Sequence, residues 1–134
     1  MNKENLKRYL EKLKSAYKRL KEVLNYSPND WDIVLDATVQ RFEFTFELSW
    51  KTIKRFAEIL AAGECKSGRS CIKLAYRLGW IKDEKVWLNL LEARNLTSHT
   101  YDYEIAMQVY QTVKENIGAF EELIESLEKE LKNL

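Results

Sequence analysis

Residues that interrupt helices are rare in this chain, and this scarcity limits what it can fold into. Its 134 residues include only 4 glycines and 1 proline. Between them lie long segments whose apolar residues recur every three or four positions, which is the spacing of one helix face. We therefore predict an all-α fold, with a single domain covering residues 1–134.

The first of these segments covers residues 3–25, where lysines and glutamates fill the positions between the apolar ones. Its apolar stripe alternates steps of four and three and consists of Leu6, Leu10, Leu13, Tyr17, Leu20 and Leu24. We expect an amphipathic helix here. Ser27 and Pro28 are residue types that favour the N-cap and the first helical position, so a second helix should begin near residue 29.

The second segment, residues 29–61, contains an ambiguity. Within it "FEFTFELSW" alternates apolar and other residues strictly, which taken alone is a strand pattern. Its flanks extend a continuous helical stripe, however, so we predict one long helix. The stripe consists of Trp31, Leu35, Thr38, Phe42, Phe46, Trp50, Ile53, Ala57 and Leu60.

A second apolar face lies on the opposite side of this long helix. It consists of Ile33, Ala37, Phe44, Leu48 and Ile59. A helix that is apolar on two sides is expected to be buried on two sides. Either a partner subunit covers the second face, or the helix lies at the centre of the bundle.

Three more helices complete the prediction. We expect a short helix over 69–78 capped by Gly79, a helix over 83–96, and a final helix over 103–132 with Asp102 as its N-cap. Four long helices and one short helix are best accommodated by an up-and-down antiparallel bundle.

The charge balance excludes a generally basic or acidic protein. Lys+Arg 22 against Asp+Glu 21 gives a formal net charge of +1, so any attraction for phosphate must be local.

The N-terminal residues are charged every few positions, and no window approaches the ~20 apolar residues of a membrane span. We expect a cytoplasmic protein without a membrane contact. In that compartment Cys65 and Cys71 should be free thiols rather than a local disulfide.

His99 is the only histidine in the sequence. One histidine far from the cysteines gives little support to a zinc site, and it cannot supply the paired Glu-x-x-His motifs of a di-iron bundle. A glycine-rich phosphate loop is also missing from the sequence. We therefore expect neither a metal nor a cofactor.

The segment "EARNLTSHTYDY" carries the candidate site. Arg94 continues an apolar stripe, and a charge near the interior needs an acidic partner, backbone carbonyls or a ligand anion. His99 would lie about 140° away on an unbroken helix. The Asn, Thr and Ser residues between them favour a helix end, and a turn there could bring both side chains to one rim. On spacing alone an interhelical salt bridge for Arg94 and a connecting-turn role for His99 remain open.

The same segment resembles a known signature. In "RNLTSHTY", Arg94, Asn95, His99 and Tyr101 fill every position of the HEPN superfamily motif: Arg, a polar residue, a spacer, His, any residue and Tyr. "QRFEFTFELSWKTIK" and "AYRLGWI" are similar to the branch called nucleotidyltransferase substrate-binding proteins. The resemblance covers nearly the whole chain.

This resemblance implies a helical bundle that forms a homodimer, with the two Arg…His motifs facing one cleft, and that acts with a separate minimal nucleotidyltransferase. It implies either of two roles. In a toxin–antitoxin module the chain would be a metal-independent endoribonuclease, silenced by adenylylation of Tyr101. Alternatively, it would be the non-catalytic subunit that binds nucleotide or another substrate for the transferase.

The residue types fit both roles. As catalytic residues, Arg94 would stabilise phosphate charge and His99 would transfer protons near neutral pH. As substrate-binding residues, Asn95 would orient the phosphate or His99, and Tyr101 would stack on an RNA base. In the binding subunit, Arg94 and His99 would hold a nucleotide phosphate only.

Overall fold

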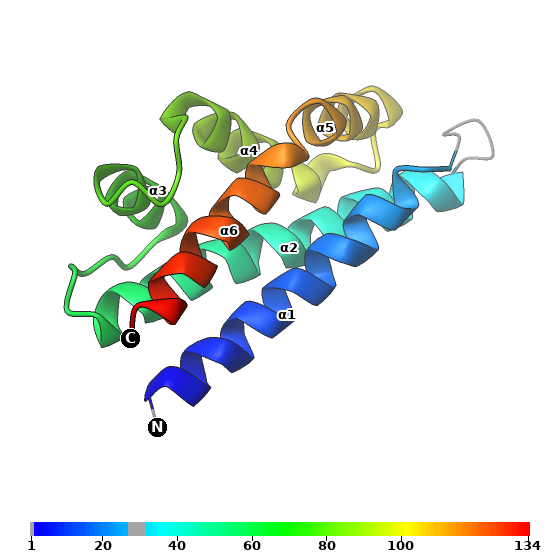
Figure 1. Cartoon of the computed structure of the whole chain (residues 1–134). Coiled ribbons are helices and arrows are strands. Elements are labelled where there is room, and N and C mark those ends of the chain that lie inside the picture. Colours follow the sequence, from blue (N-terminus) through cyan, green and yellow to red (C-terminus); the bar gives the residue numbers. More distant parts are fainter. Residues whose placement is uncertain (1, 27–31) are drawn as a thin grey trace.

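The computed structural model describes residues 2–26 and 32–134, and within these ranges it is all-α, as predicted (Figure 1). The expected start of the second helix, with Ser27, Pro28 and Trp31, lies outside the described residues. The helices are α1 (Asn2–Val23), α2 (Asp32–Ile59), α3 (Gly68–Arg77), α4 (Glu84–Leu96), the short 3₁₀ helix η1 (Thr97–His99), α5 (Tyr103–Glu115) and α6 (Gly118–Lys132).

The long helix α2 is the centre of the bundle. It contacts α1, α3, α4, α5 and α6. Helix α1 runs along one side of it, α6 packs along α1 and overlaps α2, and α3, α4 and α5 lie above α2 in the view of Figure 1. The helical interpretation of "FEFTFELSW" is thereby confirmed and the strand alternative is wrong.

Aromatic side chains of α2 form the middle of the core. The Trp87 and Phe120 rings meet edge to face at 5.3 Å, and Phe46 lies 6.3 Å from Trp87. Phe42 contacts both Phe46 and Phe120. These buried rings join α2 to α4 and α6, and burial of such large side chains is the main stabilising contribution in a core of this kind.

The second apolar face of α2 is only partly covered. Ala37, Leu48 and Ile59 are partly buried against the core. Ile33 remains 79% exposed and Phe44 53% exposed. The expected burial on two sides is therefore not completed within the chain.

The predicted final helix over 103–132 is wrong as one element, because two turn residues separate α5 from α6. Asn116 departs from helical geometry with φ −117°, and its side-chain amide donates to the Thr112 carbonyl at 2.8 Å. Helix α5 consequently contacts α4, whereas α6 contacts α1. The apolar seam stays in phase across the break, so periodicity could not reveal it. The described ranges thus hold six α-helices instead of four long and one short.

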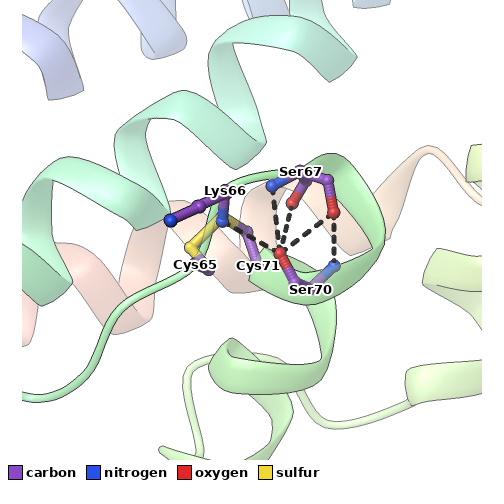
Figure 2. The surroundings of a disulfide bond; sticks show 5 residues. All are labelled: Cys65, Lys66, Ser67, Ser70 and Cys71. Carbon is purple, nitrogen blue, oxygen red and sulfur yellow. Dashed lines mark hydrogen bonds between the residues drawn. A yellow bond between two sulfur atoms is a disulfide. The ribbon is translucent and has the colours of Figure 1, made fainter.

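The loop before α3 contains a Cys65–Cys71 disulfide, so the prediction of free thiols is wrong (Figure 2). Next to it Ser67 and Ser70 form a capping box that starts α3. Helix α3 ends before Gly79, whose φ of +77° is the left-handed conformation expected of a glycine cap.

Reducing this disulfide should lower the free energy of unfolding by about 2 kcal/mol, because the bond closes a short loop in the unfolded chain. Urea denaturation with and without dithiothreitol measures the difference. The Cys65→Ala/Cys71→Ala variant is the control and should not respond to the reductant. An unchanged transition for the wild-type protein would contradict the expectation.

Candidate functional site

The motif residues lie at the α4–α5 connection, where the sequence predicted a helix end. Arg94 is in the last turn of α4, and His99 is the last residue of η1. Asp102 caps α5 as predicted, accepting hydrogen bonds from the Glu104 and Ile105 amides at 2.9 and 3.4 Å. The cap fixes the start of α5, and with it the position of the turn that precedes it.

Arg94 bridges α4 to two carboxylates on α2. Its Nε lies 3.5 Å from Glu47 Oε2, and its Nη1 lies 3.8 Å from Glu43 Oε2. Nη1 also donates a hydrogen bond to Thr97 Oγ1 at 3.1 Å. The Thr97 hydroxyl donates in turn to the Arg94 carbonyl at 2.7 Å. The side chain is therefore held by its own turn and by the central helix.

These contacts leave part of the guanidinium unsatisfied. The buried Nε of Arg94 has no hydrogen-bond partner, because the contact with Glu47 is electrostatic but is not a hydrogen bond. The Arg94 side chain is 30% exposed. The interhelical salt bridge considered from the sequence is thus present, yet the arginine keeps partial solvent access, and an oxyanion can meet the exposed part of the guanidinium.

His99 and Tyr101 form the exposed part of the motif. Their rings are 6.3 Å apart in an edge-to-face arrangement, and Tyr101 is 87% exposed. Asn95 is exposed as well. Within the described residues no ion pair, hydrogen bond or ring contact joins Arg94 to His99. His99 therefore contacts Tyr101, whereas Arg94 contacts α2, although all three residues lie in the short segment 94–101.

An open hollow of about 580 Å³ adjoins this turn. Thr100 is on one side of it, and Ile33 and Glu43 are among the α2 residues on the other. Its lining has two carboxylates, from Asp36 and Glu43, and no cation. A phosphate therefore cannot be held by the hollow itself and would have to lie at the exposed rim with Arg94 and His99.

Glu43 and Glu47 were not predicted as partners of Arg94 from the sequence. Their spacing of four places both on one side of α2, which was a visible signal. Which helix faced them could not be read from periodicity, because it depends on how α4 packs against α2. In the described part of the chain no cluster of three metal-ligating side chains is present, and no helix is long and apolar enough to cross a membrane.

Comparison with known families identifies the chain's relatives. Residues 8–129 match the family described as nucleotidyltransferase substrate binding protein like. A Haemophilus influenzae protein named probable ribonuclease HepT is 32% identical over 132 residues, covering 88% of this chain and 90% of the relative.

Solved structures share the same fold. A Thermus thermophilus protein has a TM-score of 0.79 at 28% identity, covering 86% of this chain and 98% of that one. A Haemophilus influenzae structure, described as the fold of a substrate binding domain of a nucleotidyltransferase, has a TM-score of 0.78 at 28% identity over 89% and 98%. A tri-AMPylated Shewanella oneidensis HEPN toxin in complex with MNT antitoxin has a TM-score of 0.75 at 17% identity over 92% and 96%.

The Arg94→Met variant should remain folded and lose at most about 1 kcal/mol of stability. The ion pairs with Glu43 and Glu47 are partly exposed, and such pairs contribute little. Methionine keeps the apolar stem and removes the unsatisfied Nε. Urea denaturation measures the change, with Glu43→Gln as the matched variant on α2. A much larger loss, about 3 kcal/mol or more, would show that Arg94 serves the fold rather than a ligand.

Proposed function

The chain belongs to the nucleotidyltransferase substrate binding protein like family of HEPN-type bundles, and from that premise we propose that it is the HEPN subunit of a two-component nucleotidyltransferase/HEPN module. In this role it binds RNA at Arg94 and His99 in a dimer cleft and cleaves it without a metal. The observation that carries the proposal is the complete set of Arg94, Asn95, His99 and Tyr101 in the partly exposed segment that joins α4 to α5.

Arg94 binds the scissile phosphate in this proposal. Its partial exposure supports that role, and the anchoring by Glu47 and Thr97 supports a fixed orientation. A fixed cation stabilises the charge that develops on the phosphorane oxygens without reorganising during the reaction.

His99 transfers the protons. One neutral imidazole accepts the proton of the ribose 2′-OH while the 2′-oxygen forms a bond to phosphorus. The bond from phosphorus to the 5′-oxygen breaks, and an imidazolium donates the proton that this oxygen needs. The products are a 2′,3′-cyclic phosphate and a 5′-hydroxyl. When both proton transfers occur in the same step, one imidazole acts as the base and a second acts as the acid.

Because each chain has one histidine, the reaction needs a homodimer with both His99 side chains in one cleft. Ile33 is the best candidate for the contact, since it is exposed and lines the same hollow as Thr100. A dimer built on this end of α2 would bury Ile33 and bring the two motifs together.

Tyr101 is the proposed regulatory residue. Its hydroxyl is available to a modifying partner because the side chain is almost fully exposed. Adenylylation by a separate minimal nucleotidyltransferase would place a phosphate and a bulky nucleotide beside His99, blocking the cleft. A HEPN toxin of the same fold is described as tri-AMPylated, which motivates this step.

RNA as the substrate places the protein in the cytoplasm. A disulfide is unusual there, but Cys65 and Cys71 are both buried, which limits access for a reducing thiol.

The second candidate is a non-catalytic subunit that presents a nucleotide or another substrate to the transferase. The fold of the Haemophilus substrate binding domain favours it. In that case Arg94 and His99 would hold a phosphate, and the partner would supply the chemistry.

Purified protein should cleave single-stranded RNA in EDTA, and His99→Ala should reduce the rate by about 10²-fold or more. Arg94→Met should have a similar effect through loss of charge stabilisation. Gel electrophoresis and mass spectrometry of the products test for the cyclic phosphate. The Lys85→Ala variant, which changes an exposed residue outside the motif, is the control and should cleave as the wild-type protein does. If a folded dimer, unmodified at Tyr101, cleaves no RNA but binds nucleotide through Arg94, the second candidate is correct.

The Ile33→Glu variant should be monomeric at micromolar concentration, because a charge would be buried in the proposed interface. Sedimentation velocity measures the state, and the same sample should lose RNA cleavage. Tyr76→Glu, an exposed aromatic on α3, is the matched control and should stay dimeric. A monomeric wild-type protein, or a dimeric Ile33→Glu variant, would contradict the proposed interface.

A further inference from the structure

A second groove lies between α1 and α2 and has an open volume of about 590 Å³. Five basic side chains line it, compared with two acidic ones, Glu11 and Glu47. The basic residues are Arg8, Lys12, Arg19, Arg41 and Lys51. In a chain with a net charge of only +1, this is a local excess of positive charge.

The cations on α1 are not neutralised by the fold. Arg8, Lys12 and Arg19 lie on one side of the helix, are exposed, and form no ion pair within the described residues. The rise of 1.5 Å per residue spreads them over about 17 Å. On the opposite wall Arg41 is fixed by donating to the Arg19 carbonyl at 2.7 Å. The cations therefore form a row rather than a single point.

The groove also has an apolar surface. Phe44 is 53% exposed there, beside Leu48. An exposed aromatic ring among cations is the combination that binds single-stranded nucleic acid, since bases stack on the ring while phosphates meet the charges.

Glu47 belongs both to the groove and to the surroundings of the candidate site. This residue lines the groove, and its Oε2 is 3.5 Å from Arg94 Nε. Arg94 and the Trp50 indole N–H, at 3.0 Å, partly offset its negative charge. A strand in the groove would thus reach Arg94 without leaving the surface of α2.

We propose that the α1–α2 groove is an extended binding track for single-stranded RNA, which holds the strand whose scissile phosphate lies at Arg94. This inference rests on the proposed function and adds to it a substrate length requirement. An RNA strand is favoured over a second copy of the chain because a row of unpaired cations matches repeated phosphates, and over an acidic peptide because the track leads to the candidate phosphate site.

Binding is tested with a fluorescent 2′-O-methyl oligouridine of about 12 nucleotides, which lacks the attacking hydroxyl and cannot be cleaved. Phe44→Ala should weaken binding about tenfold or more through lost stacking. Arg8→Gln/Lys12→Gln should reduce the slope of log affinity against log salt by about 1.4, since each lost contact contributes about 0.7.

The matched control variants carry the same kinds of substitution at exposed positions outside the groove. Arg77→Gln/Lys85→Gln removes two exposed cations from α3 and α4, and Tyr76→Ala removes an exposed aromatic ring. Both controls should bind as the wild-type protein does. Cleavage of a dinucleotide, which occupies only the Arg94 site, should be unaffected by the groove variants, whereas kcat/KM for long RNA should fall.

The outcomes separate this inference from the proposed function. Groove-dependent binding of the oligomer, together with no cleavage of unmodified RNA, would support the track and remove the ribonuclease role. His99-dependent cleavage with no effect of the groove variants would overturn the track and leave the ribonuclease role intact. The proposed track is also overturned if the wild-type protein does not bind the oligomer. It is overturned as well if poly-glutamate binds as tightly and depends on Phe44, or if the groove variants weaken binding only because the dimer dissociates.

Discussion

The structure depends on α2 packing simultaneously against every other long helix. Its buried rings, Phe42 and Phe46, fix α4 and α6 through Trp87 and Phe120. Because a close-packed interior leaves little freedom for such large side chains, the position of α4 on α2 is determined by the core. The position of Arg94 relative to Glu43 and Glu47 follows from that packing. The candidate site is therefore a consequence of how the core is filled.

The sequence predicted the helices well where local chemistry and periodicity agreed. The strand-like "FEFTFELSW" was resolved by its flanks, and the caps at Asp102 and Gly79 were readable from residue type. The break at Asn116 was not predictable, because the apolar seam continues in phase through it. Tertiary packing decides the break, because α5 packs against α4 whereas α6 packs against α1. The Cys65–Cys71 bond was missed because an expectation about the compartment outweighed the short spacing.

For the candidate site, the sequence supplied the residues but not their partners. The end of α4 between Arg94 and His99 was predicted from the Asn, Thr and Ser residues, and hydroxyls there do stabilise the turn: Thr97 and Thr100 donate to backbone carbonyls at 2.7 and 2.9 Å. The glutamates that hold Arg94 belong to a helix more than forty residues earlier in the chain. The spacing of the two glutamates was visible in the sequence, but which residue they would face was not, so only the fold identifies the pairing.

The partners of Arg94 have a consequence for how the site would work. Two glutamates near one arginine leave the local charge negative, so an isolated phosphate would be attracted weakly. A long RNA strand is different, because its other phosphates can meet the cations of the α1–α2 groove, and each such contact releases counterions. The scissile phosphate would then reach Arg94 at high effective concentration, as one part of a bound strand. On this argument, the acidic surroundings of Arg94 favour strands long enough to occupy the groove over free nucleotides and short fragments.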